Sequence, residues 1–424
     1  MENKRRNPAG HAGNAKPPIG APGSLAGLRV LELGQLIAGP FAARMLGDFG
    51  ADVIKIEAPD RDGIQGGDPL RKWRKLHPDD PDGTSLWWYV QARNKRSVTI
   101  NLRTPAGQEL VRKLAATSDI IIENFRPGAM EKWGLSYESL AKENPGLIFV
   151  RLSGYGQTGP YRERPGFGSI AEAMGGMRYV TGFPDRPPVR MNLSIGDTLA
   201  ALHAVIGALS ALRHRYETGE GQVVDVALYE AVFNVMESTL PEYAAYGMVR
   251  ERTGTNLTGI VPSNTYPTGD GGHIVIGANG DSIFKRLMRA IGRDDLGNDP
   301  ALADNAGRAA QHERIDGAIG EWTGSRPLAE SLEVLEKADV PSGKIYSAAD
   351  WHEDPQFVAR QMIQQMPMPD GTPISIPAPV PKLSKTPGDT KWLGPTLGEH
   401  TDEILAELGL DAAQLAALRA DGAI

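Results

Sequence analysis

Residues 28–57 read LRVLELGQLIAGPFAARMLGDFGADVIKIE, and this stretch decides the fold. The pattern predicts a strand over 28–33, a loop over 34–40, a helix over 41–49 and a second strand over 51–57. A strand, a helix and a strand in this order are typical of a parallel pair with a right-handed crossover. The opening of the chain therefore indicates an α/β sheet, which binds ligands at the carboxyl ends of its strands.

The same alternation continues along the chain. Further strands are expected over 97–102, 119–123, 147–152 and 223–226, with helices over 104–116, 199–216 and 228–246. The predicted fold class is α/β, with a doubly wound, mainly parallel, Rossmann-like large domain and a smaller α+β domain. The 34–40 loop lacks the GxGxxG fingerprint and nothing resembles GxxxxGK[ST], which argues against NAD and ATP as leading ligands.

A change to polar, glycine-rich sequence near residue 248 indicates a second domain. Two domains suit a chain of 424 residues. The expected divisions are a disordered arm over 1–24, a large α/β domain over 25–230, a linker over 231–259, a small α+β domain over 260–325, a second linker over 326–346, and a segment over 347–424 that completes the large domain.

The composition excludes several classes of function. A formal net charge of −7 leaves no general basic surface, so nucleic acid is not an expected partner. The absence of cysteine excludes disulfides, thiolate metal sites and a thiol nucleophile, and it is compatible with a cytoplasmic location. No uninterrupted apolar run approaches the roughly 20 residues that span a bilayer, so no membrane partner is expected. We also expect no bound metal.

One carboxylate stands out in the run LSIGDTLAALH at 193–203. Asp197 lies where an apolar, β-branched stretch meets the long predicted helix. A carboxylate in this position loses water, and the N–H groups of a helix start can orient it and stabilise charge on a nearby acyl oxygen. We interpret Asp197 as the nucleophile of an acyl-transfer enzyme. The alternative is a helix cap, because Asp is among the best N-cap residues.

Several motifs occur in one order between residues 25 and 408. They are VLEL at 30–33, AGP at 38–40, FGADVIKIE at 49–57, NKRS at 94–97, ENFRPG at 123–128, SGYG at 153–156, GD at 196–197, TGEGQ at 218–222 and LGEHT at 397–401. With these motifs in this order, the chain resembles the members of the class III CoA-transferase family. That family includes formyl-CoA, carnitine and dicarboxylate CoA-transferases and the related 2-methylacyl-CoA racemases.

The resemblance implies an activity and a mechanism. Coenzyme A is a co-substrate rather than a tightly bound cofactor, and Asp197 attacks an acyl-CoA thioester to form an anhydride and then an aspartyl-CoA thioester. The donor is expected to be succinyl-CoA or another short acyl-CoA, and the acceptor a small carboxylic acid. Gly277, Asn279 and Gly280 occupy the position of the family's flexible glycine-rich loop, which excludes water; a simple turn is the alternative. The family also implies a homodimer of interlocked chains.

The resemblance further assigns binding residues. Those that match the region around the adenine and phosphates of CoA are Lys95, Arg96, Asn124, Phe125, Arg126, Gly128, Ala129, Met130 and Lys132. Those expected around the acyl groups are Gln35, Ile37, Ala38, Arg164, Gly168 and Arg190. Arg164 and Arg190 are candidates for the distal carboxylate of a dicarboxylate, and a structural salt bridge is the alternative for each.

The chain departs from the family pattern at Phe167 and Gly168. The racemases carry a His-Asp pair there, and racemisation needs two opposed proton-transfer groups at the α-carbon. The departure therefore favours transfer over racemisation. It also removes a carboxyl group that formyl-CoA transferases carry. The alternatives that stay open are an acyl-CoA racemase or epimerase and a non-catalytic acyl-CoA binding protein.

Overall fold

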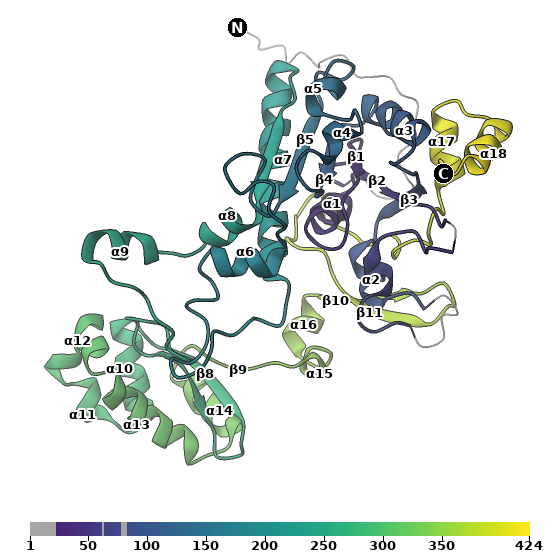
Figure 1. Ribbon diagram of the computed structural model, residues 1–424. Helices are drawn as coiled ribbons and strands as arrows, with labels where there is room; N and C mark the ends of the chain where they lie inside the picture. The colour runs from purple at the N-terminus through teal and green to yellow at the C-terminus, as the bar shows by residue number, and fades with distance from the viewer. Residues whose placement is uncertain (1–22, 62, 78–82) are drawn as a thin grey trace, which may run out of the picture. The chain divides into compact units, whose positions relative to one another are not determined.

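The computed structural model describes residues 23–61, 63–77 and 83–424, which form two compact units (Figure 1). The first unit comprises the chain up to Gly176, Met191–Met236 and Arg360–Ile424, and the second comprises Met177–Arg190 and Glu237–Ala359. The disordered arm expected over residues 1–24 lies almost wholly outside the described residues.

The second unit contains residues that the sequence assigns elsewhere, among them the expected linker over 326–346, which forms α14 (Leu328–Lys337) and β9 (Ser342–Lys344). The sequence predicts residues 177–190 in the large domain, but they belong to the second unit, where Arg252 Nη1 donates to a carbonyl of this segment at 2.9 Å. Residues 347–359 also belong to the second unit, where Asp350 pairs with Lys344. The contact of Arg252 joins segments more than 70 residues apart, which a local sequence pattern does not contain.

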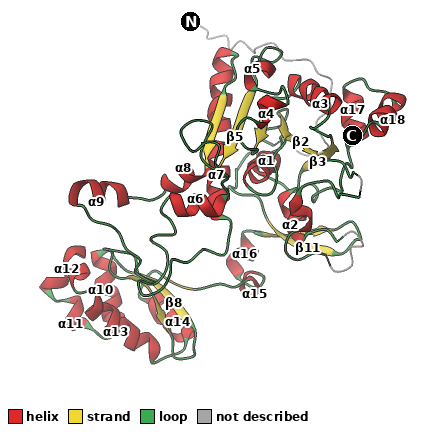
Figure 2. Ribbon diagram, in the orientation of Figure 1, coloured by secondary structure: helices red, strands yellow, loops and turns green. Residues whose placement is uncertain are grey.

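A six-stranded sheet forms the centre of the first unit (Figure 2). Its strand order is β3-β2-β1-β4-β5-β6, and all neighbouring strands are parallel. This is the order of a doubly wound sheet, in which the direction of growth reverses between β1 and β4. The predicted parallel α/β architecture is confirmed. The strands are β1 (Arg29–Glu32), β2 (Asp52–Glu57), β3 (Lys95–Thr99), β4 (Ile120–Glu123), β5 (Ile148–Ser153) and β6 (Val223–Ala227).

Helices cover both faces of this sheet because successive strand side chains point to opposite faces. Leu31 and Ile121 share a buried cluster with α3 (Pro105–Ala116), and Val53 contacts the other helix layer at α1 (Ala38–Asp48). Strands buried on both faces are nearly continuously apolar, as observed here. The C-terminal helices α17 (Thr401–Glu407) and α18 (Ala412–Ala420) add to the cluster that holds Leu31.

Helix α7 (Ile195–Thr218) packs against α1, β5 and β6. Its buried side consists largely of alanines, so neighbouring backbones approach it closely. Among the described helices, α7 alone is long and apolar enough to cross a membrane, and 44% of its apolar window is buried within the protein. A core helix with an extended apolar side has the same length and composition.

Short elements connect the layers of the first unit. They are the 3-10 helix η1 (Pro69–Lys72), α2 (Leu86–Gln91), α4 (Ala129–Lys132), α5 (Tyr137–Leu140), α6 (Gly168–Met174), α8 (Leu228–Phe233), β10 (Ile363–Pro367) and β11 (Pro373–Pro377). The single helix expected over 228–246 is wrong. Helix α8 ends at Phe233 and α9 begins at Thr239, and Glu237 between them has a φ of 50°, which is not helical.

The second unit contains a three-stranded antiparallel sheet in the order β7-β8-β9. Ile274 of β8 and Phe284 of α10 share its buried core. Its elements are α9 (Thr239–Tyr246), β7 (Ser263–Pro267), β8 (His273–Gly277), α10 (Asp281–Ala290), α11 (Asp294–Gly297), η2 (Pro300–Leu302), α12 (Asn305–Ala310), α13 (His312–Gly324), α14 (Leu328–Lys337), β9 (Ser342–Lys344), α15 (Ala348–Trp351) and α16 (Pro355–Ala359).

Candidate active site

A doubly wound fold usually binds its ligand at the carboxyl edge of the sheet, beside the two neighbouring strands at which the direction of growth reverses. In this sheet those strands are β1 and β4. A reciprocal pair of hydrogen bonds joins the loops that follow these two strands. Asn124 Oδ1 accepts from the Gln35 N–H at 2.8 Å, and Asn124 Nδ2 donates to the Gln35 carbonyl at 2.9 Å. The backbone of the loop before α1 is therefore fixed at the switch point.

Asp197 lies at this same edge of the sheet. Helix α7 leads into the parallel strand β6, so it must begin at the carboxyl edge. Ser194 occupies the N-cap, and Asp197 is the third residue of the helix and half-buried. The alternative that Asp197 is the N-cap residue is therefore wrong. The positive end of the helix dipole favours the charged form of a carboxylate in this turn.

A glycine of α6 makes room for the Asp197 carboxylate. A Cβ atom built on Gly168 would lie 2.1 Å from Asp197 Oδ2 and 2.7 Å from Asp197 Cγ. No side chain fits at position 168 while the carboxylate keeps this place. The departure from the family pattern at Gly168 thus has a physical consequence, because the space of the missing side chain holds the Asp197 carboxylate.

The crossing of α6 and α7 is also tight at Gly196, the residue before Asp197. A Cβ atom on Gly196 would lie 2.8 Å from the Gly168 carbonyl oxygen and 3.3 Å from Glu172 Cγ. Glu172 is buried at 1% exposure. Backbone-to-backbone packing therefore sets the position of the first turn of α7, and with it the position of the Asp197 carboxylate.

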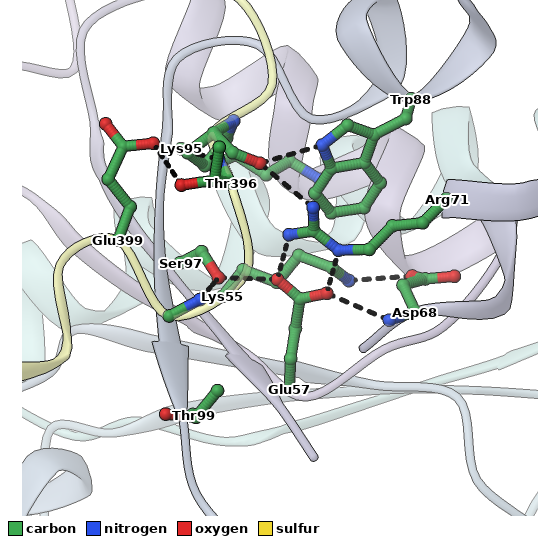
Figure 3. A network of polar contacts seen from close by, with 12 residues as sticks. Lys55, Glu57, Asp68, Arg71, Trp88, Lys95, Ser97, Thr99, Thr396 and Glu399 are labelled. Atoms are coloured by element: carbon green, nitrogen blue, oxygen red, sulfur yellow. Dashed lines mark hydrogen bonds and ion pairs between the residues drawn. The ribbon is translucent and has the colours of Figure 1, made fainter. Parts of the chain in front are cut away.

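A network of buried charges holds the loop after β1, and Figure 3 shows the contact between Lys55 and Asp68 within this network. Lys55 Nζ lies 2.7 Å from Glu32 Oε1, 2.9 Å from Asp68 Oδ2 and 2.9 Å from the Gly34 carbonyl. Asp68 accepts a hydrogen bond from the Leu36 N–H at 3.0 Å. Leu36 has a φ of 62°, so this bond supports a conformation that residues other than glycine rarely adopt.

The same network holds the segment around η1 (Figure 3). Arg71 donates to both oxygens of Glu57 at 2.8 and 2.7 Å, and through Nη1 to the Pro395 carbonyl at 3.0 Å. Its guanidinium lies 3.7 Å from the centre of the Trp88 ring. Burial raises the pKa of Glu57, but Arg71, Lys55 and Ser97 together outweigh burial and hold that pKa below its usual value. Glu57 therefore stays charged and anchors Arg71.

Lys95, which the sequence assigns to CoA binding, is completely buried in this network. Its Nζ lies 2.7 Å from Glu32 Oε2 and 2.7 Å from the Pro40 carbonyl. Burial lowers the pKa of Lys95 to about 8, although the attraction of Glu32 opposes this. An ammonium group engaged inside the protein does not reach a ligand phosphate. The structure thus corrects the assignment, because Lys95 holds the start of α1.

The structure separates the other predicted CoA residues into two groups. Met130 has 0% exposure in the core, and Arg96 pairs with Asp52 at 2.5 Å and Glu403 at 2.8 Å. Met130 is not placed to flank adenine, which corrects that assignment. The role of the partly exposed Arg96 at a phosphate stays a prediction. Those at least partly exposed along the loop after β4 and on α4 are Asn124, Phe125, Arg126, Gly128, Ala129 and Lys132.

Five of the predicted acyl-site residues, Gln35, Ile37, Ala38, Arg164 and Gly168, lie in the first unit, and Arg190 lies in the second. Gln35 is exposed beside the switch point, whereas Ile37 and Ala38 are buried at the start of α1. Arg164 is exposed on the loop before α6. The binding of one distal carboxylate by Arg164 and Arg190 therefore stays a prediction.

The loop with Gly277, Asn279 and Gly280 lies in the second unit, between β8 and α10. The Asn279 carbonyl accepts a hydrogen bond from Arg308 Nη2 at 2.6 Å. Gly280 is the N-cap of α10 with a φ of −72°, a value open to any residue. Within its own unit, the loop has the form of a short hydrogen-bonded turn.

A cavity that the sequence does not reveal opens beside the start of α7. Its volume is about 340 Å³, and its lining residues are Arg74, Lys75, Leu86, Trp87, Leu193 and Ser194. Leu193 and Ser194 are neighbours of Asp197 in the sequence. No sequence signal places the other four beside them, because they lie more than 100 residues earlier.

The family of the chain follows from its similarity to known proteins. The profile of CoA-transferase family III matches residues 25–401. A succinyl-CoA–D-citramalate CoA-transferase from Chloroflexus aurantiacus is 50% identical over 400 residues, which cover 94% of this chain and 98% of the relative. The chain therefore belongs to CoA-transferase family III and is an enzyme of that class.

Other relatives extend this similarity. A succinate–glutarate CoA-transferase from Agrobacterium fabrum is 36% identical, with 93% of this chain and 96% of the relative covered. Among solved structures, a CaiB/BaiF family protein from Brucella suis has a TM-score of 0.79 at 36% identity, with 92% of this chain and 100% of that chain covered. The sheet and its helices thus match a fold already seen by crystallography.

Proposed function

We propose that this enzyme transfers CoA from succinyl-CoA to a small carboxylic acid, with Asp197 as the nucleophile. The observation that carries the proposal is the Asp197 carboxylate, which is seated against Gly168 in the first turn of α7 at the ligand-binding edge of the sheet. The donor is inferred from relatives at 50% and 36% identity whose names include succinyl-CoA or succinate.

The proposed reaction proceeds through covalent intermediates on Asp197. Its carboxylate attacks the thioester carbonyl, which forms a mixed anhydride and expels CoA thiolate. The thiolate attacks the aspartyl carbonyl, which releases succinate and leaves an aspartyl-CoA thioester. The acceptor carboxylate then attacks this thioester, and the expelled thiolate attacks the acceptor carbonyl of the new anhydride. These last steps yield the new acyl-CoA and restore Asp197.

The protein contributes placement, charge and exclusion of water. Fixed packing between Gly168 and Gly196 holds the carboxylate in one position, which favours attack. The start of α7 stabilises the charged nucleophile. Anhydride intermediates must be protected from water, and we assign this role to the Gly277–Gly280 loop as part of the proposal.

We assign the nucleotide end of CoA to the loop after β4 and to α4. Arg126 and Lys132 are exposed cations that can neutralise phosphates, and the half-exposed Phe125 offers an aromatic face near them. The Phe125 ring is itself held by an edge contact with Trp133, with the ring centres 5.1 Å apart. This surface follows β4, one of the two strands at the switch point.

We also propose a homodimer. The outer side of α7 exposes Leu202, Ile206, Leu209 and Tyr216, which recur at helical spacing along one face. Strand β6 beside it is an edge of the sheet. A second copy of the chain would cover this apolar face. Sedimentation should show a dimer for the wild type and dissociation for Ile206→Asp; a monomeric wild type would contradict the proposal.

Turnover assays test the proposed reaction. The enzyme is incubated with succinyl-CoA and separate acids, and the acyl-CoA products are resolved by chromatography. We expect a new acyl-CoA with at least one short carboxylic acid, and none with Asp197→Ala. Exchange of deuterium at the substrate α-carbon without an acceptor would instead indicate a racemase. Equal turnover by wild type and Asp197→Ala would refute the assigned nucleophile.

A further inference from the structure

The cavity beside the start of α7 combines two cations with apolar and aromatic walls. Six residues line it: Arg74, Lys75, Leu86, Trp87, Leu193 and Ser194, of which the last two precede α7. We propose that this cavity binds the distal carboxylate of a dicarboxylic acyl group, and that Arg74 and Lys75 thereby select dicarboxylic over monocarboxylic substrates. The inference rests on the proposed function, because the acyl group arrives as a CoA thioester or a free acid.

The cavity lies at the right place for this role. Ser194 is the N-cap of α7, and Asp197 is three residues further along the first turn. A helix rises about 1.5 Å per residue, so the two positions are about 5 Å apart along the axis. A short acid that reacts at Asp197 with one end can therefore place its other end against Ser194 and the neighbouring cations.

Both cations are placed to meet an incoming anion. Among the residues that the structure describes, no carboxylate forms an ion pair with Arg74 or Lys75. The Arg74 guanidinium lies 4.6 Å from the centre of the Trp87 ring. Stacking on an aromatic face orients a guanidinium while its edge N–H groups stay open, and these groups match the two oxygens of a carboxylate.

Hydrogen bonds hold the backbone that carries these cations. The Leu86 N–H donates to the Lys75 carbonyl at 3.0 Å, and the Ser85 hydroxyl donates to the Trp73 carbonyl at 2.7 Å. Arg74 has a φ of 60°, which is costly for a side chain of this size. Strained backbone of this kind persists where the surrounding structure fixes it, and it is concentrated at binding sites.

The buried network ties this segment to the loop after β1. Arg71 precedes Arg74 by three residues and is anchored by Glu57 and by the Pro395 carbonyl (Figure 3). Asp68, in the same network, also holds the Leu36 N–H. The segment with the two cations and the loop at the switch point are therefore fixed to one rigid base.

The cavity also has the size of a small-molecule site. Its volume of about 340 Å³ is at the lower end of ligand pockets, which span roughly 300–1,000 Å³. A short dicarboxylate suits this volume better than a long acyl chain. Its mainly apolar lining lowers the local dielectric constant, which strengthens the attraction between a carboxylate and the cations.

Equilibrium binding of two unreactive thioethers tests the proposal. Carboxypropyl-CoA carries a distal carboxylate and propyl-CoA does not, and calorimetry measures both on the full chain. We expect the wild type to bind carboxypropyl-CoA at least about tenfold more tightly, and we expect Arg74→Asn/Lys75→Gln to lose this preference while its affinity for propyl-CoA stays unchanged. Asn is chosen at position 74 because it tolerates a positive φ.

A matched control removes the same two charges elsewhere. Arg103→Gln/Lys113→Gln changes two exposed cations, one just before α3 and one within it, and it should keep the preference for carboxypropyl-CoA. Thermal unfolding of each variant verifies its fold. In steady-state assays, the Arg74/Lys75 variant should show a raised KM for succinyl-CoA and a smaller ratio of kcat/KM between succinyl-CoA and a monocarboxylic donor.

The outcomes separate the cavity from the proposed function. Equal binding of both thioethers by the wild type, or a preference that survives in the Arg74/Lys75 variant, overturns the role of the cavity while CoA binding stands. Failure of both thioethers to bind the wild type would overturn the proposed function, and the cavity proposal with it.

Discussion

Gly168→Ala is the substitution that tests the position of the Asp197 carboxylate most directly. The added Cβ would lie 2.1 Å from Asp197 Oδ2, whereas ordinary contacts begin near 3.4 Å. Since the overlapping atoms belong to the end of a side chain, the carboxylate can move away by rotation. We therefore expect a folded protein in which the Asp197 carboxylate is displaced by about 1 Å or more.

The size of the effect follows from this displacement. A misplacement of about 1 Å in a reacting group can cost roughly 100-fold in rate, so we expect kcat to fall about 100-fold. A side chain forced from its preferred rotamer costs about 0.5–1.5 kcal/mol, so stability should change little. The loss should appear in the rate of acylation of Asp197, and the affinity for CoA should stay near that of the wild type.

Rapid quenching after mixing with succinyl-CoA measures that acylation rate, and urea unfolding measures stability. The matched control is Gly320→Ala in α13, where a Cβ meets nothing within 4 Å and acylation should be unchanged. A folded Gly168→Ala protein that acylates at the wild-type rate would refute the argument that this glycine clears space for the nucleophile.

Three further predictions concern the framework. Glu32→Gln leaves the two lysines that share this carboxylate buried without it, and should cost about 3–5 kcal/mol in urea unfolding; a loss under about 1 kcal/mol would contradict the network. Gly196→Ala drives a Cβ to 2.8 Å from a backbone oxygen and should cost about 1–3 kcal/mol, whereas unchanged stability would mean a looser helix crossing. Burial raises the pKa of Glu123 to about 7, although Arg151 opposes this shift. The stability that its bound proton contributes is therefore complete below about pH 4.5 and is lost as the pH rises through 7, by about 3 kcal/mol at most. Glu123→Gln should flatten this pH dependence of stability, and parallel curves for wild type and variant would contradict the prediction.

The sequence predicts the sheet well because the signals for the sheet are local. Strands buried on both faces are nearly continuously apolar, and residues 28–57 contain a complete strand, helix and strand. The place of Asp197 is predictable for the same reason, since a carboxylate at the start of an alanine-rich helix is visible in the sequence. The distinction between the N-cap and the first turn was missed, because Ser194 and Asp197 are both good residues for a helix start.

The burial of charged side chains could not be predicted. Lysine and arginine usually lie at the surface of a protein. Lys95 and Arg71 are nevertheless buried, and each forms an ion pair with a residue more than ten positions away in the sequence. Long-range pairs of this kind leave no periodic signal in the sequence. Arg190 shows the same limit, because only the fold assigns it to the second unit. The cavity with Arg74 and Lys75 likewise forms only when a segment from before α2 meets the start of α7.

The most direct test of the central claim is the mass of the intact protein after incubation with succinyl-CoA. The account predicts an adduct of one CoA in thioester linkage, removed by hydroxylamine, mapped by peptide fragmentation to Asp197 and missing from Asp197→Ala. An adduct on another residue, or catalytic turnover with no adduct on Asp197 at any time after mixing, would contradict it.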